Sequence, residues 1–232
     1  MFRLFRLYRS ILLCLMTFSL SLEWGPLGEE RLRWGMASGD PFVREVALTF
    51  DDGPRERGMQ ELIEALYPFD LTASFFLVGK FAERYATITL SLHEAGHELE
   101  NHTFTHPKLY TLWTEKIMRE MERCNEVFEN LNLPPAYFMR PPGGSFNLKV
   151  FNAVRRMDMR LGLWDVNTAD YTGRASEDII RTIMSTVGNG SVILMHSGVP
   201  NTVRALPELV RQLKARGYRI VSMRDLWNAG AI

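Results

Sequence analysis

Short apolar runs alternate with longer amphipathic segments from residue 43 to the end of the chain. The longer segments place apolar residues three and four positions apart, with charged residues between them, which is typical of helices packed against a core. This alternation predicts repeated β-α units. The expected strands are residues 46–50, 73–78, 98–102, 136–139, 160–166, 191–196 and 219–222, and the expected helices are residues 59–67, 81–95, 114–130, 148–157, 176–187 and 203–216.

Parallel strands that alternate with helices form either a closed barrel or an open sheet. A barrel of eight units typically takes about 250 residues, and residues 43–232 provide fewer. The sequence therefore predicts an α/β domain that is either a barrel lacking a unit or an open sheet. In both architectures, functional side chains gather at the carboxyl ends of the strands.

The first 24 residues follow a different pattern. Arg3, Arg6 and Arg9 precede an apolar run from Ile11 to Leu22, which is the order of a secretory signal. The run is short for a spanning helix, which needs roughly 20 apolar residues, although extension past Trp24 would allow an uncleaved anchor. We predict a signal peptide or membrane anchor over residues 1–24, a linker over residues 25–42, and export of the domain that follows.

The composition excludes several classes of protein. The chain has 232 residues, of which 46% are hydrophobic, so it can build a sizeable core. It carries 27 basic and 27 acidic residues, so no basic field is available to hold a nucleic acid. Its two cysteines lie far apart, at Cys14 and Cys124, which argues against a disulfide framework or a cysteine metal site. Any metal must therefore be bound by His, Asp or Glu.

Polar side chains follow five of the expected strands. A buried apolar strand does not require a carboxylate, an imidazole or a guanidinium at its end, so these residues need another explanation. They are Asp51 and Asp52 after the first strand, His102 and His106 after the third, Arg140 after the fourth, Asn167 and Asp170 after the fifth, and His196 after the sixth. Because the carboxyl ends of parallel strands meet at one edge, we expect these side chains to converge there.

Two of these groups together have the composition of a metal site. Asp-Asp-Gly alone is usually a turn, but Asp51 and Asp52 point in different directions, so one can bind a cation while the other faces a reacting water. His102 and His106 have the spacing of one face of a helical turn, where both can bind one ion. Two imidazoles and one carboxylate leave open positions, as hydrolytic zinc sites require. Imidazole also suits iron, nickel and cobalt, so zinc is only a preference.

His196 and Arg140 each have an ordinary structural interpretation and a functional one. A lone histidine after an apolar strand is more often a structural residue, but beside a metal site His196 becomes a candidate general acid, because its unperturbed pKa lies near neutral pH. Arg140 precedes Pro-Pro-Gly-Gly, which is typical of a loop. Its guanidinium could also form a bidentate pair with Asp51, which would orient that carboxylate and keep it ionised.

With these residues assembled, the chain resembles the polysaccharide deacetylases (carbohydrate esterase family 4, the NodB homology domain) over about residues 43–225. Four segments are similar to the family's motifs and occur in the family's order. They are Thr-Phe-Asp-Asp-Gly-Pro at 49–54, His-Thr-Phe-Thr-His at 102–106, Arg-Pro-Pro at 140–142 and Leu-Met-His at 194–196.

The resemblance implies a deformed (β/α) barrel of about seven parallel strands and a metal-dependent hydrolase. The expected reaction removes acetyl groups from N-acetylated amino sugars, as in peptidoglycan or chitin. The resemblance implies the following roles: Asp51 is the general base, positioned by Arg140; His196 is the general acid; Asp52, His102 and His106 hold the metal; and the backbone N–H of Gly143 contributes to oxyanion stabilisation. Tyr171, where the family most often has Trp, is a candidate substrate contact.

Three further positions depart from the family pattern. Asn167 stands where the family's fourth motif would most often have the Asp that supports the acid histidine. It could still bond His196 but adds no negative charge, unless Asp165 or Asp170 substitutes for it. Gly143 replaces an aromatic residue, so a wall of the sugar groove is expected to be missing. Glu100 stands where a small residue is common.

Two alternatives to the deacetylase remain open at this stage. One is an O-acetyl carbohydrate esterase, which shares the metal and the base but needs the acid less. The other is a catalytically impaired protein that binds wall glycans. In each case the expected partner is an acetylated polysaccharide and not a nucleic acid, membrane contact is limited to the N-terminal segment, and the protein is a monomer. We expect it outside the cell, associated with the wall or anchored to the membrane.

Overall fold

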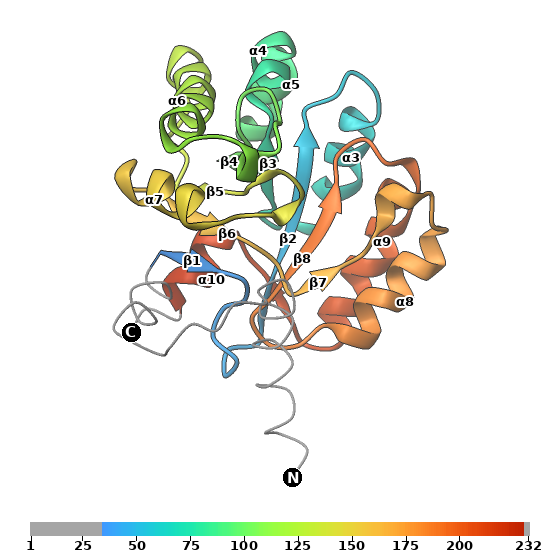
Figure 1. The fold of residues 1–232 in the computed structure, drawn as a ribbon. Helices are drawn as coiled ribbons and strands as arrows, with labels where there is room; N and C mark the ends of the chain where they lie inside the picture. The colour runs from blue at the N-terminus through green and yellow to red at the C-terminus, as the bar shows by residue number, and fades with distance from the viewer. Residues whose placement is uncertain (1–33, 230–232) are drawn as a thin grey trace. The chain divides into compact units, whose positions relative to one another are not determined.

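A curled sheet of parallel strands forms the centre of the domain (Figure 1). The structure is a computed structural model, and it describes residues 34–229. The strands follow the order β1-β6-β5-β4-β3-β2-β8-β7, and β9 pairs with the start of β2. Their bounds are Gly35–Met36 (β1), Glu45–Gly53 (β2), Ser74–Leu77 (β3), Glu98–Asn101 (β4), Phe138–Met139 (β5), Arg160–Gly162 (β6), Val166–Asn167 (β7), Ser191–His196 (β8) and Arg219–Ile220 (β9). The predicted deformed barrel is confirmed, and it is open between β1 and β7, the first and last strands of this order.

Helices surround the outside of the curled sheet (Figure 1). Their bounds are Met59–Leu66 (α3), Gly79–Arg84 (α4), Ala86–Glu94 (α5), Thr114–Asn130 (α6), Leu148–Arg156 (α7), Ser176–Thr186 (α8), Pro200–Ala215 (α9) and Met223–Ala229 (α10). Short 3-10 turns lie at Tyr67–Phe69 (η1), Leu109–Thr111 (η2), Pro142–Gly144 (η3) and Asp170–Thr172 (η4). No helix within residues 34–229 is long and apolar enough to cross a bilayer.

Successive side chains along each strand point alternately to the outer and the inner face of the curled sheet. In β2, Val46, Leu48 and Phe50 belong to the large core cluster under the surrounding helices, while Ala47 belongs to a second cluster inside the barrel. Because successive strand residues point to opposite faces, Asp51 follows Ala47 on the inner face. Its position inside the barrel is therefore a direct consequence of strand periodicity.

The amino-terminal end of the barrel is closed by β1 and α10. The inner cluster is formed by residues from the strands and from these two elements, namely Met36, Ala47, Phe76, Phe138, Val192, Met223 and Leu226. The backbone N–H of Met223 donates to the hydroxyl of Ser74, at the start of β3, over 2.8 Å. The polar residues of the site lie at the opposite end of the strands.

Both closing elements were absent from the predicted set of elements. The predicted linker over residues 25–42 is wrong for its described part, because Gly35–Met36 forms β1 and pairs with β6. The helix α10 does have a sequence signal, since Ser222 and Asp225 form a reciprocal cap: the Asp225 N–H donates to the Ser222 hydroxyl, which donates to the Asp225 carboxylate. The predicted N-terminal segment, residues 1–24, lies outside the described residues.

Most other boundaries agree with the predicted elements. The helix over residues 114–130 and the strand over residues 191–196 are confirmed to the residue. The predicted strand over residues 160–166 is instead two strands, β6 and β7, and the predicted helix over residues 81–95 is broken at Tyr85, which leaves helical geometry with φ −112° and ψ 47°.

Replacement of Leu226 by Ala should destabilise the domain by about 2–4 kcal/mol, because truncation of a buried leucine leaves a cavity. Leu226 is 1% exposed inside the barrel, whereas Leu148 is 58% exposed. The matched variant Leu148→Ala should therefore cost less than about 1 kcal/mol. Urea unfolding measures both free energies, and equal losses would contradict this account of the barrel end.

Candidate active site

The end of strand β2 separates two adjacent carboxylates. The pairing of β2 with β3 shifts register between Asp51 and Gly53, and Asp52 adopts a left-handed backbone with φ 69°. A bulge of this kind redirects the side chain at the strand end. As a result, Asp51 stays on the inner face of the barrel while Asp52 turns toward the loop that carries His102 and His106.

Asp51 is held by a fully buried arginine. Arg140 Nη1 lies 2.7 Å from Asp51 Oδ1 and donates a second bond of 2.8 Å to the hydroxyl of Thr49. The predicted pairing of Arg140 with Asp51 is found, but it is not bidentate. The other guanidinium nitrogens donate to the carbonyls of Gly162 and Leu163, over 2.8 and 3.0 Å. One buried cation therefore orients the Asp51 carboxylate from inside the barrel.

Asp52, His102 and His106 form a compact set of metal-binding side chains. Asp52 Oδ1 lies 3.4 Å from Nε2 of His102 and 3.0 Å from Nε2 of His106, and one ligand atom from each residue falls within 4.8 Å of the others. Burial alone would raise the pKa of Asp52, but hydrogen bonds and charge from the two histidines lower that pKa well below its ordinary value. The Asp52 carboxylate is therefore ionised, as a metal ligand must be.

The orientation of His102 supports a metal site at this cluster. His102 Nδ1 lies 2.8 Å from the backbone carbonyl of Arg140, so this nitrogen carries the proton. In the neutral imidazole that binds a metal, the lone pair is then on Nε2, the nitrogen that lies 3.4 Å from Asp52 Oδ1. Metal-binding histidines commonly have this arrangement, in which a backbone carbonyl fixes the tautomer. The residues present thus fit a divalent metal with one carboxylate and two imidazole ligands.

The two histidines are brought together without the helical turn that the sequence predicts. Residues 102–106 form a non-helical loop in which Thr103 and His106 have positive φ, of 66° and 64°. The side chain of Asn101 accepts from the Thr103 N–H, and the Thr103 hydroxyl accepts from the His106 N–H. The imidazole rings lie with centroids 5.0 Å apart. The side-chain proximity was predicted, but the backbone that produces it is a left-handed turn.

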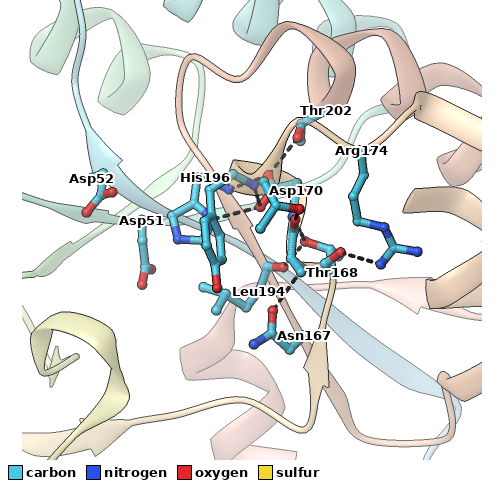
Figure 2. Close-up of polar contacts among 12 residues, drawn as sticks. Asp51, Asp52, Asn167, Thr168, Asp170, Arg174, Leu194, His196 and Thr202 are labelled. Atoms are coloured by element: carbon cyan, nitrogen blue, oxygen red, sulfur yellow. Dashed lines mark hydrogen bonds and ion pairs between the residues drawn. The ribbon is translucent and has the colours of Figure 1, made fainter. Parts of the chain in front are cut away.

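His196 ends strand β8 beside Asp51, its partner in the β2–β8 ladder. Its Nδ1 lies 2.7 Å from Asp170 Oδ1, and its backbone N–H donates to Asp170 Oδ2 over 2.8 Å. Burial alone would lower the pKa of His196, but the hydrogen bond and charge of Asp170 outweigh it and raise that pKa. Figure 2 shows this pair beside Asp51 and Asp52. Protonated His196 is therefore stabilised next to the base and the metal ligands.

The residue that supports His196 is Asp170 and not Asn167. Asn167 is exposed, and its side-chain oxygen accepts from the backbone N–H of Ala169 over 2.9 Å (Figure 2). Asp165 does not take this place either, because its carboxylate accepts from Ser191 and Val192 at the start of β8. Ala169 has positive φ, of 50°, and this turn carries Asp170 back beneath the imidazole.

The remaining sequence candidates surround this centre. Gly143 is exposed in η3 with φ 66°, and open space surrounds the position of its missing side chain. The Tyr171 ring is 62% exposed and packs edge-on to the His196 ring, with centroids 5.0 Å apart. Glu100 is buried away from the metal ligands, where its carboxylate accepts from the N–H groups of Tyr137 and Phe138.

Three contacts of the site were not predicted. Thr49 and Asp51 both accept a hydrogen bond from Arg140. Thr49 lies two residues before Asp51 on the same face of the strand, and this spacing could have predicted the contact. The Thr202 hydroxyl donates to Asp170 Oδ2 over 2.6 Å from the first turn of α9, and nothing in the local sequence marks it. Arg55 lies 3.6 Å from Asp52 Oδ2, on the side away from the histidines.

Comparison with known proteins identifies the family to which this site belongs. The family model described as polysaccharide deacetylase matches residues 39–162, which is more than half of the chain. The chain belongs to the polysaccharide deacetylase family. The sequence resemblance and the enzyme class inferred from it are thereby confirmed at the level of the family.

Proteins similar to this chain include named deacetylases and a pseudoenzyme. The chain is 28% identical to the peptidoglycan-N-acetylmuramic acid deacetylase PdaC of Bacillus subtilis over 81% of its own length and 39% of that protein. It is 29% identical to a peptidoglycan-N-acetylglucosamine deacetylase of Bacillus cereus over 84% of its length and 73% of that protein. A pseudoenzyme of carbohydrate esterase family 4 from Bacillus anthracis has a similar structure, with a TM-score of 0.77 and 26% identity over 83% of this chain and 68% of that one.

Addition of Zn²⁺ to the metal-free protein should raise its melting temperature, because a ligand that binds only the folded state stabilises it, by about 2.7 kcal/mol at a free concentration 100 times Kd. His106→Ala should remove most of this increase, while His93→Ala, at an exposed histidine of α5, should retain it. Differential scanning fluorimetry with and without Zn²⁺ measures the shift. An undiminished shift in His106→Ala would exclude the proposed ligand set.

Replacement of Asp170 by Asn should lower the pKa of His196, because the charge that raises it is removed. A histidine whose pKa is raised on folding stabilises the folded state fully below its unfolded pKa, about 6.5, and that stabilisation is lost as pH rises through the folded value. As pH rises from about 6.5 through the folded pKa of His196, the free energy of unfolding should therefore decrease more in the wild type than in Asp170→Asn. An NMR titration of His196 measures the pKa, with Asp178→Asn at a partly exposed surface ion pair as the control. An unchanged titration would contradict the role of Asp170.

Proposed function

We propose that this protein is a metal-dependent deacetylase that hydrolyses the N-acetyl groups of amino-sugar polysaccharides. The observation that carries the proposal is the position of Asp51. This carboxylate is held by buried Arg140, lies 3.8 Å from the metal-ligand candidate His102, and pairs in the sheet with His196. A base, a metal-binding set and an acid are thus adjacent at one end of the barrel.

The metal-binding set would be Asp52, His102 and His106. When bound there, a divalent metal supplies Lewis-acid polarisation of the acetyl carbonyl and of the attacking water. Zinc is the preferred ion for a site of one carboxylate and two imidazoles, while Co²⁺, Ni²⁺ and Fe²⁺ suit the same ligands. Three protein ligands leave coordination positions for water and substrate.

The chain's own residues account for the proton transfers of amide hydrolysis. Asp51 accepts a proton as the water oxygen attacks the acetyl carbonyl carbon, and Arg140 keeps the Asp51 carboxylate oriented. The backbone N–H of Gly143 is proposed to donate to the oxyanion that develops on the carbonyl oxygen. His196 then gives a proton to the nitrogen as the C–N bond breaks. The products are acetate and a free amino sugar.

The proposed substrate is peptidoglycan or a chitin-like polymer. The relatives named above act on N-acetylmuramic acid or N-acetylglucosamine of peptidoglycan. The chain spans 39% of the length of the first and 73% of the second, so only the catalytic region is compared for the former. Tyr171, exposed beside His196, is proposed as a contact for the reacting sugar.

The proposed location is outside the cell. Wall glycans are extracellular, and the first 24 residues have the composition of a signal peptide or membrane anchor. The catalytic domain would then occupy the rest of the chain, act as a monomer and contact the membrane only through the N-terminal segment.

A catalytically impaired binding protein remains the second candidate, because one similar structure is a pseudoenzyme. The substitution at Asn167 does not favour this alternative, because Asp170 and not Asn167 bonds His196. Asp51, Asp52, His102, His106, Arg140 and His196 are all present in mutually consistent geometry. An O-acetyl esterase has the same groups, so amide and ester substrates must be assayed side by side.

Asp51→Asn should retain metal binding and reduce acetate release by roughly 10²–10⁴-fold, the usual contribution of a general base. The measurement is acetate release from peptidoglycan and from chitin oligomers by zinc-loaded protein, with metal content determined in parallel. An O-acetylated sugar assayed alongside distinguishes an amidase from an esterase.

Asp178→Asn provides the matched surface control and should leave the rate unchanged. Near-normal activity in Asp51→Asn would overturn the assignment of the base. No release by the wild type from any substrate, with metal bound, would favour the binding-protein alternative.

A further inference from the structure

We propose that Tyr110 and Trp113 form a stacking platform for a sugar unit of the glycan outside the reacting one, so that the enzyme selects polymer chains over short oligomers. Their side chains are 47% and 69% exposed. We call these two residues the aromatic platform. The assignment of a glycan as its ligand rests on the proposed function. It goes beyond that function because it assigns a second contact with the polymer.

The platform lies on a loop that begins at the metal-binding set. Tyr110 is four residues after His106, so its Cα lies at most about 14 Å from that of the proposed ligand. Both platform residues are also tied to one short segment after Gly143. Asn147 Nδ2 donates to the carbonyl of Tyr110 over 3.4 Å, and the Lys149 ammonium stands 4.3 Å from the centre of a Trp113 ring. Two loops that carry site residues therefore build this surface together.

Lys149 also contacts the ring of Trp113. A cation over the ring is attracted to its π face and restrains the ring orientation. The ammonium stands over the indole, and 69% of the Trp113 side chain remains exposed. An exposed aromatic ring held in one orientation is suited to stacking.

The position of Trp113 in the chain carries an energetic cost. Trp113 is the N-cap residue of α6 and makes no side-chain cap hydrogen bond. Ser, Thr, Asp and Asn are preferred at this position because their side chains accept from an unpaired N–H of the first turn. The indole therefore contributes neither to the cap nor to the core, since it is exposed. The Trp113 indole is therefore free to make a contact outside the domain.

The ligand that fits is a neutral, extended chain of sugar rings. Each pyranose ring presents axial C–H groups on its faces and hydroxyls on its rim, so a face stacks on an aromatic ring while the rim remains hydrated. A glycan whose reacting unit lies at Asp51 and His196 extends in both directions along its length. Because α6 and α7 follow the parallel strands β4 and β5, their first residues lie at the same end of the barrel as the active site. This placement favours a polysaccharide over a second copy of this chain as the occupant.

The test compares the full-length wild type with Trp113→Ser on chitin oligomers of two to six units. Serine is a good N-cap, so the variant should keep or raise the melting temperature, and a loss of activity would not reflect unfolding. We expect kcat/KM for the longest oligomer to fall roughly tenfold while kcat/KM for the shortest oligomer that is turned over is unchanged. Trp113→Phe should recover most of the loss, because it restores an aromatic face.

A second arm is independent of catalysis. In an Asp51→Asn background, co-sedimentation with insoluble peptidoglycan should weaken about tenfold on Trp113→Ser. Phe42→Ser is the matched control, since Phe42 is 91% exposed but precedes β2, at the opposite end of the strands from Asp51. This control should bind and turn over every substrate as the wild type does.

The outcomes separate the platform from the proposed function. Equal losses of kcat/KM at every oligomer length, or no loss at any length together with unchanged sedimentation, would overturn the platform. A wild type that releases no acetate would refute the proposed function, and the sedimentation arm would then decide the platform by itself. Dissociation of a dimer by Trp113→Ser, seen by analytical ultracentrifugation, would assign the surface to a second copy of the chain and overturn the glycan assignment.

Discussion

The buried guanidinium of Arg140 is the interaction on which the site and the barrel interior both depend. It bonds Asp51 and Thr49 of β2 and the carbonyls of Gly162 and Leu163 at the end of β6, the strand next to β5. It also stacks 3.8 Å above the Phe76 ring. A fully buried charge is costly unless it is paired and its donors are satisfied, and removal of one partner of such a pair typically costs about 3–5 kcal/mol. Burial lowers the pKa of Arg140 while Asp51 opposes this. The Asp51 carboxylate thus stabilises the charged form of Arg140.

The same residue connects the base to the metal-binding set. The side chain of Arg140 holds Asp51, while its backbone carbonyl fixes the tautomer of His102. A shift of β5 would therefore misplace both groups together. This coupling explains how a site assembled from loops after several strands can keep its geometry: the strand that supplies the arginine is packed between β4 and β6.

Strand periodicity explains how much of this could be predicted from the sequence. The polar residues after apolar runs marked the strand ends, and parallel pairing brings those ends together. The convergence of Asp51, His102, Arg140 and His196 could therefore be predicted. Elements without a long periodic pattern were missed, because β1 has two residues and α10 has seven. Their stability comes from packing inside the barrel, which no local pattern reports.

Loop geometry decides which side chain supports His196. The sequence left this support open among Asn167, Asp165 and Asp170, and the structure gives the contact to Asp170. A spacing of three residues does not reveal which side chain faces the imidazole, because the answer depends on the left-handed turn at Ala169. The two histidines show the same limit: their spacing suggested a helical turn, and a different backbone produces the same proximity.

Left-handed residues recur where the loops present the site, at Asp52, Thr103, His106 and Ala169. Such a conformation costs of order 1–2 kcal/mol for a residue with a side chain and persists where neighbouring contacts hold it. At Ala169 the contact is the Asn167 side-chain oxygen, which accepts from the Ala169 N–H. Asp and Asn both provide that acceptor. Asn167 is therefore a positioning residue for the turn that brings Asp170 to His196. Its neutral amide is sufficient for that purpose, because the negative charge beside His196 is supplied by Asp170.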